Sequence, residues 1–205
     1  MKPSLTASQS ALIITFAGTA GMGVIAYALS ALFGVSLNDQ FSLSVKDALL
    51  GIAATAPPAL LLLFIMRTKN PFLVSFRKRQ IEYFAELPFS FSPLFIITAS
   101  VAAGIFEEML FRGFLQTTLA LYMPLAAAIL LSNIVFGLLH WNSAFTAALT
   151  GLVGVYLGVI FAVTGNLLTV MIAHGLYDIL AMTISAPLIR RAKNAKMPDT
   201  DDTSL

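Results

Sequence analysis

Three charged residues lie inside an otherwise apolar stretch that is long enough to cross a membrane: Glu107, Glu108 and Arg112. One charged side chain at the centre of a bilayer costs at least ~2.5–3.5 kcal/mol on insertion scales, and crossing a membrane requires none. Later apolar segments contain further ionisable side chains, namely His140, His174 and Asp178. We therefore expect these residues to have a chemical role.

Helical spacing assigns different tasks to the two glutamates. Glu108 and Arg112 are four residues apart, so they share a helix face and can form an ion pair. Glu107 is turned by ~100° around the helix. From this we expect that the two carboxylates do not face the same partner. Glu108 would be held by Arg112, and Glu107 would point into a cavity as a general base. The alternative is that these charges only join the helix to its neighbours.

The histidines allow several interpretations. His140 lies at the end of its apolar segment, where a lone histidine is ordinarily an interfacial residue. His174 and Asp178 are four residues apart and share a helix face. They could form half of a metal site, an oriented histidine or a structural hydrogen bond. At a rise of ~1.5 Å per residue, Glu107 and these three residues lie at compatible depths. Polar groups at one depth on three helices suggest one water-filled cavity.

The composition identifies an integral membrane protein. Of the 205 residues, 58% are hydrophobic and 11% are charged, whereas soluble domains carry about 25% charged residues. The net charge of +2 is too small to indicate a nucleic-acid partner. The absence of cysteine excludes disulfides, thiolate metal ligands and a cysteine nucleophile. The partner that the composition predicts is the lipid bilayer.

Six apolar segments have about the ~20 residues that are needed to cross the hydrocarbon core. They predict an all-α bundle of six transmembrane helices in one domain over residues 1–205, with a motif-bearing core at about 94–182 and a short polar tail at 189–205. The expected spans are 11–34, 47–66, 94–119, 123–141, 144–163 and 166–188. Pro57-Pro58 should kink or break the second span, for which a re-entrant helix is the alternative. The apolar run before Ala28-Leu29-Ser30 could alternatively be a cleaved signal peptide.

The basic residues predict the orientation of these spans. With six spans, ten of the twelve Lys and Arg residues fall on one side. By the positive-inside rule this side is cytoplasmic and holds both termini. Residues 75–88 are expected to form an amphipathic helix at the membrane surface. Small residues along the fifth span are expected to pack against a neighbouring helix: Ala147, Gly151, Gly154 and Gly158.

The charged and polar residues form three motifs, one on each of three separate predicted helices. They are Glu107-Glu108-x-x-x-Arg112, Phe136-x-x-x-His140 and His174-x-x-x-Asp178. In this order they resemble the motifs of the CAAX protease and bacteriocin-processing (CPBP, or Abi) family of intramembrane glutamic endopeptidases. The resemblance covers roughly residues 94–182 and does not extend to the first two helices.

The resemblance implies a role for each site residue. Glu107 would activate water for attack on a peptide carbonyl, and His140 would hold and polarise that water. His174 and the residue at position 178 would stabilise the oxyanion, with Glu108 and Arg112 as the supporting pair. Prenyl endopeptidases of this family have Asn where this chain has Asp178. An amide can donate to an oxyanion, whereas an ionised carboxylate would repel it, so Asp178 would act when protonated or would orient His174.

These implications describe a metal-independent endopeptidase in a bacterial plasma membrane. Its substrate would be a peptide or a lipidated protein, and its active site would open toward the cytoplasmic half. One alternative is a zinc protease with Glu107, His140, His174 and Asp178 as ligands, although His-Glu-x-x-His is absent. A second is a non-catalytic membrane protein for bacteriocin immunity or scaffolding. A third is a transporter, although no internal repeat is evident.

Overall fold

The computed structural model describes residues 5–196, and every regular element in this part of the chain is a helix. This confirms the predicted all-helical class. The elements are α1 (Ala7–Phe33), η1 (Asn38–Gln40), α2 (Val45–Ala54), α3 (Ala56–Arg67), α4 (Pro71–Ala85), α5 (Pro93–Glu108), the π-helix η2 (Met109–Gln116), α6 (Thr117–Ala120), α7 (Leu125–Leu139), α8 (Ala144–Thr164) and α9 (Leu167–Lys196). The expected polar tail is therefore helical as far as Lys196, and its remainder lies outside the described residues.

In the described part of the chain, five stretches of helix are long and apolar enough to cross a membrane. They are Ala7–Phe33, Val45–Arg67, Pro93–Ala120, Ala144–Thr164 and Leu167–Ala195. The predicted fourth span corresponds to α7, which has only 15 residues, fewer than the ~20 that a full crossing needs. These apolar helices indicate that the chain is an integral membrane protein. The number of crossings and the side that holds the termini stay predictions.

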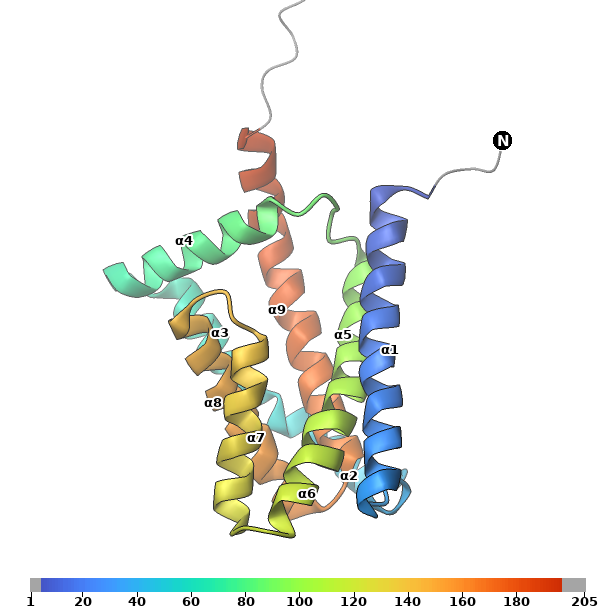
Figure 1. Ribbon diagram of the computed structural model, residues 1–205. Coiled ribbons are helices and arrows are strands. Elements are labelled where there is room, and N and C mark those ends of the chain that lie inside the picture. The colour runs from blue at the N-terminus through green and yellow to red at the C-terminus, as the bar shows by residue number, and fades with distance from the viewer. Residues whose placement is uncertain (1–4, 197–205) are drawn as a thin grey trace, which may run out of the picture.

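The centre of the bundle is an antiparallel pair, α5 and α9, with α1 packed against α5 (Figure 1). Gly104 allows this close approach, because a Cβ at this position would lie 2.8 Å from the backbone of both Met171 and Gly175. A second tight pair is formed by α7 and α8. A Cβ on Gly151 would lie 3.1 Å from the backbone oxygen of Asn133, which confirms helix packing as the use of the small residues of α8.

Side-chain caps fix where several helices begin. Ser92 accepts a hydrogen bond from the backbone N–H of Phe95 at the start of α5, and Pro93 occupies the first helical position. Ser143 caps α8 by accepting from the N–H of Thr146. Such caps satisfy donors that have no partner within the helix. At the other end of α8, Gly165 adopts the left-handed backbone conformation with a φ of 65°, which glycine adopts at little cost.

The predicted break in the second span occurs at Thr55, between α2 and α3. A proline has no N–H, so Pro58 leaves the carbonyl of Ala54 without its usual helical donor. The hydroxyl of Tyr156 in α8 donates to this carbonyl at 3.0 Å. A neighbouring helix thus satisfies the backbone group that the proline frees, as a membrane interior requires.

The amphipathic helix expected at 75–88 is α4, which begins earlier, at Pro71, and lies across one end of the bundle (Figure 1). Its Phe72 and Phe76 pack edge-on against Phe145 of α8. Gln80 donates to Thr146 at 3.0 Å and accepts from Asn142 at 3.3 Å. Therefore α4 covers the loop that follows His140, and its place at a membrane surface stays a prediction.

Candidate active site

The structure brings the residues of all three sequence motifs into one cluster. Glu107 and Glu108 end α5, and Arg112 follows them in η2. His140 forms the C-terminal cap of α7, where the shortness of this helix leaves the imidazole beside α5. His174 and Asp178 lie on the middle of α9. The predicted convergence of these side chains is therefore observed, while the role of each in catalysis stays a prediction.

Glu108 and Arg112 form an ion pair from which solvent is fully excluded. The guanidinium Nη1 donates to Glu108 Oε1 at 2.7 Å, and both side chains have an exposed fraction of 0%. Nη2 donates to Asn133 Oδ1 at 2.9 Å and to the backbone oxygen of Gly154 at 2.8 Å. The guanidinium carbon lies 5.0 Å from the centre of the Phe136 ring. Arg112 thus joins η2 to α7 and α8 and fixes the carboxylate of Glu108.

Two buried amide side chains were not predicted from the sequence: Asn133, which belongs to this network, and Gln116, which lies beside it near Gly158. Asn133 accepts from Arg112 and donates to the backbone oxygen of Ile129 at 2.8 Å. Gln116 donates to the backbone oxygen of Gly158 at 3.0 Å. Each is an amide side chain inside an apolar segment. Both could have been found in the sequence as neutral polar side chains within apolar segments, by the same reasoning that identified the charged residues.

His174 contacts carboxylates with both ring nitrogens. Its Nδ1 lies 2.6 Å from Glu108 Oε1, a hydrogen bond in a buried setting. Its Nε2 lies 3.5 Å from Asp178 Oδ2 and 4.0 Å from Glu107 Oε2. His174 and Asp178 therefore share a face of α9, as their spacing predicted.

These distances contradict the expectation that the two glutamates do not face the same partner. Glu107 and Glu108 do diverge around α5, but the imidazole of His174 lies between their side chains. Its two nitrogens point in different directions, so one reaches Glu108 and the other approaches Glu107. The expectation was wrong because the shared partner is a ring with a polar atom on either side, so side chains that diverge around a helix can both approach it.

Glu107 and His140 face each other across a short gap. Glu107 Oε2 lies 3.9 Å from His140 Nε2. No hydrogen-bond donor among residues 5–196 reaches this buried oxygen. His140 Nδ1 lies 2.9 Å from the backbone oxygen of Phe136. Because a carbonyl can only accept, Nδ1 must donate, which leaves Nε2 of the neutral ring as an acceptor. The gap is too long for a direct hydrogen bond.

Glu107, His140, His174 and Asp178 line one cavity of about 450 Å³. Apart from these groups its walls are mainly apolar, and they include Thr15, Thr19, Phe84, Phe91, Tyr177, Met182, Ser185 and Ile189. The cavity therefore extends from the charged cluster along α9 toward the end of the bundle that α4 covers. Within the described residues, no three His, Asp or Glu side chains have an arrangement suited to a metal ion.

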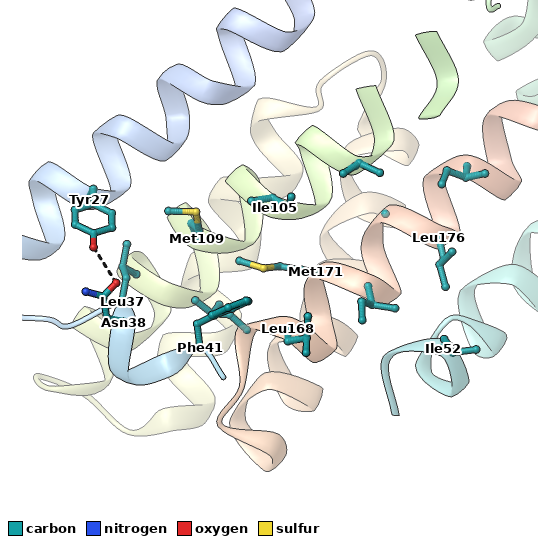
Figure 2. A pocket seen from close by; sticks show the side chains of 15 residues that line it. Tyr27, Leu37, Asn38, Phe41, Ile52, Ile105, Met109, Leu168, Met171 and Leu176 are labelled. Carbon is teal, nitrogen blue, oxygen red and sulfur yellow. Dashed lines mark hydrogen bonds between the residues drawn. The ribbon is translucent and has the colours of Figure 1, made fainter. Parts of the chain in front are cut away.

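A larger cavity, of about 670 Å³, lies on the opposite faces of α5 and α9 (Figure 2). Figure 2 shows Ile105, Met109, Met171 and Leu176 along its walls, and a hydrogen bond of 2.8 Å from Tyr27 to Asn38 at one end. The motif residues are not among those that line it. This cavity is therefore separate from the charged cluster.

Comparison with known proteins found a family that matches the part of the chain that contains the cluster. Residues 89–180 match the family model described as type II CAAX prenyl endopeptidase Rce1-like. No match was found among curated proteins or among solved structures. The matched segment begins just before α5, contains all three motifs and ends within α9. Residues 89–180 of this integral membrane protein therefore match the Rce1-like family of CAAX endopeptidases.

Proposed function

We propose that this protein is an intramembrane endopeptidase that hydrolyses a peptide bond of a membrane-associated substrate with a water molecule activated by Glu107. The observation that carries the proposal is the approach of Glu107 Oε2 to His140 Nε2 at 3.9 Å on the wall of the cavity. Family membership of residues 89–180 supports a peptide hydrolase at the level of the family.

The first chemical step uses two acceptors that face one water. A water between Glu107 and His140 donates one hydrogen to each and turns a lone pair toward the substrate carbonyl. As its oxygen bonds to the carbonyl carbon, one of its protons passes to Glu107. The C=O π electrons become the oxyanion of the tetrahedral intermediate. The C–N bond then breaks as Glu107 returns this proton to the leaving amine.

In this proposal His174 stabilises the oxyanion. With hydrogen on both nitrogens, the ring donates through Nδ1 to Glu108 and presents Nε2–H to the cavity. Asp178, 3.5 Å from Nε2, orients the ring. Preorganised donors of this kind act on charge that develops in the transition state. Arg112 fixes Glu108, and Glu108 fixes the other side of the imidazole.

The cavity favours an apolar segment of substrate. Its charged groups are confined to one region, and the other wall residues are mainly apolar, including Phe84, Phe91 and Ile189. We propose a peptide or lipidated protein as substrate, in a bacterial plasma membrane. The positive-inside rule then places the α4 end of the bundle, and the opening of the site, in the cytoplasmic half.

The test compares membranes from cells that express the wild type or Glu107→Gln at matched levels, by mass spectrometry of terminal peptides. We expect protein termini that are present only with the wild type. The control is Glu82→Gln, which changes a half-buried glutamate of α4 that pairs with Lys78 at 3.8 Å, and it should retain every cleavage.

Two outcomes would contradict the proposal. Identical terminal peptides with wild type and Glu107→Gln, together with a retained phenotype, would favour the non-catalytic immunity or scaffold role. Cleavage that a chelator abolishes and zinc restores would favour the metal-dependent mechanism instead.

A further inference from the structure

The π-helix η2, which carries Arg112, has carbonyl groups that accept hydrogen bonds from side chains. Thr117 Oγ1 lies 2.9 Å from the backbone oxygen of Arg112. The Nε2 of Gln40 donates to the backbone oxygen of Gly113 at 3.1 Å. A π-helical turn contains one residue more than the register of an α-helix allows, and such turns are rare and concentrate at functional sites. We therefore expect contacts from other parts of the chain to stabilise the π-helical register of η2.

Gln40 comes from a distant part of the chain, the loop that follows α1, and is 73 residues from Gly113. Its Nε2 also donates to the backbone oxygen of Ser36 at 3.0 Å, which holds the amide in place. Its Oε1 lies 3.1 Å from Thr117 Oγ1. The Thr117 hydroxyl has one hydrogen, so it donates to either Gln40 or Arg112 at a time. One side chain thus contacts the middle of η2 and the residue that follows its C-terminal end.

The same loop also packs against η2 through an apolar contact. Leu37 is buried, and a Cβ on Gly113 would lie 2.5 Å from its side chain. Phe33, at the end of α1, packs edge-on against Phe114. The loop therefore follows the surface of η2 closely, and Gln40 supplies the hydrogen bonds of that contact.

We propose that Gln40 is a positioning residue for the catalytic cluster, because it holds η2 in the π-helical register. If the extra residue of η2 moved, the side chains past it would rotate by ~100° around the helix axis. The guanidinium of Arg112 would then leave Glu108, Asn133 and Gly154. Glu108 would lose its fixed position against His174. This inference rests on the proposed function. It also assigns a role to the first part of the chain, which lies outside the matched residues 89–180.

The experiment measures peptide hydrolysis by the full chain in lipid nanodiscs, with a substrate that the terminal-peptide comparison has identified. It compares the wild type, Gln40→Leu and the control Asn38→Ala. Asn38 lies in the same loop, but its side chain accepts from Tyr27 and not from η2. For Gln40→Leu we expect kcat to fall about tenfold, because a typical hydrogen bond contributes ~1 kcal/mol and Gln40 contacts η2 through more than one part-buried hydrogen bond. KM should stay within about twofold, because Gln40 does not line the catalytic cavity. Asn38→Ala should leave both constants unchanged.

A second measurement reports on η2 without using activity. Deuterium exchange of the amides in peptides covering residues 109–117 should become about tenfold faster in Gln40→Leu, while peptides from α8 keep the wild-type rate. Thr117→Val should give the same local change, and Thr117→Ser, which keeps the hydroxyl, should restore the wild-type values. If Gln40→Leu does not fold, the pair of Thr117 variants provides the same test.

The outcomes separate this inference from the proposed function. Wild-type kcat and wild-type exchange in Gln40→Leu, with Glu107→Gln inactive in the same assay, would overturn only the role of Gln40. A similar loss of exchange protection throughout the chain would also overturn it, because Gln40 would then act on general stability. Full activity of Glu107→Gln would overturn the proposed mechanism, and the exchange data would still decide whether Gln40 holds η2.

Discussion

At the scale of single residues, Arg112 is the side chain on which the buried network depends. It is fully buried and donates three hydrogen bonds, to Glu108, Asn133 and the backbone of Gly154. Arg112→Ala would leave the carboxylate of Glu108 buried without its cation. Breaking a buried pair in this way costs about 3–5 kcal/mol. We expect the free energy of unfolding in detergent to fall by about this amount.

The control for Arg112 is Lys78→Ala. Lys78 also pairs with a glutamate four residues away, Glu82, but at 3.8 Å and on an exposed surface. Exposed pairs contribute about 1 kcal/mol or less. Equal effects of the two substitutions would contradict the central place of Arg112 in the fold.

The role of Asp178 can be tested separately from that of its neighbour His174. If Asp178 orients His174, Asp178→Asn keeps an oxygen that can accept from Nε2, and kcat should stay within about tenfold of the wild type. His174→Ala should reduce kcat by about 10²–10³, the typical loss for an oxyanion donor. Steady-state kinetics on a substrate identified by its terminal peptides would measure both. A larger loss for Asp178→Asn than for His174→Ala would show that Asp178 has its own role in the chemistry.

The types and spacing of residues could predict the members of the site but not their mutual contacts. Glu108 with Arg112 and His174 with Asp178 follow from four-residue spacing within one helix. The bond from His174 to Glu108 joins two helices that are far apart in the sequence, and spacing carries no information on how those helices approach. Asn133 was missed because a neutral amide in an apolar helix is a weaker signal than a charge.

At the scale of elements, α2 and α3 show how a break inside a membrane is stabilised. Tyr156→Phe removes the donor to the carbonyl of Ala54 and should reduce the free energy of unfolding by about 1–3 kcal/mol, the cost of an unsatisfied buried acceptor. When Pro58→Ala is also present, Tyr156→Phe should reduce the free energy of unfolding by less, because residue 58 regains the N–H that bonds to the carbonyl of Ala54. A double-mutant cycle of unfolding free energies measures the coupling. Strict additivity would show that Tyr156 stabilises the break by another contact.

Apolar periodicity could predict the helices but not the details that shape the site. Pro57-Pro58 predicted the break because proline lacks a donor. The π-helix η2 has no comparable signal, since its register depends on side chains from elsewhere, including Gln40. The fourth span was predicted at 123–141, and α7 covers Leu125–Leu139. This small difference matters because it places His140 at the very end of the helix, where its ring can reach Glu107.

At the scale of the whole molecule, one contact bears on the number of membrane crossings. The Nζ of Lys193, near the end of α9, donates to the backbone oxygens of Leu87 at 2.7 Å and Phe89 at 3.1 Å. The end of α9 and the loop after α4 therefore lie at the same end of the bundle (Figure 1). The chain between them must cross the membrane an even number of times. This favours counting the short α7 as a crossing, with six in all.

The absence of cysteine allows a direct test of this topology in intact cells. Single cysteines at exposed positions, Lys46→Cys, Lys78→Cys and Arg190→Cys, are treated with a membrane-impermeant maleimide. We expect labelling of Lys46→Cys alone, and of all three after permeabilisation, because the positive-inside rule places the other two in the cytoplasm. Labelling of Lys46→Cys together with Arg190→Cys would show five crossings and separate the end of α9 from α4. Labelling of Lys78→Cys and Arg190→Cys without Lys46→Cys would keep six crossings but invert them, which would turn the opening of the catalytic cavity away from the cytoplasm.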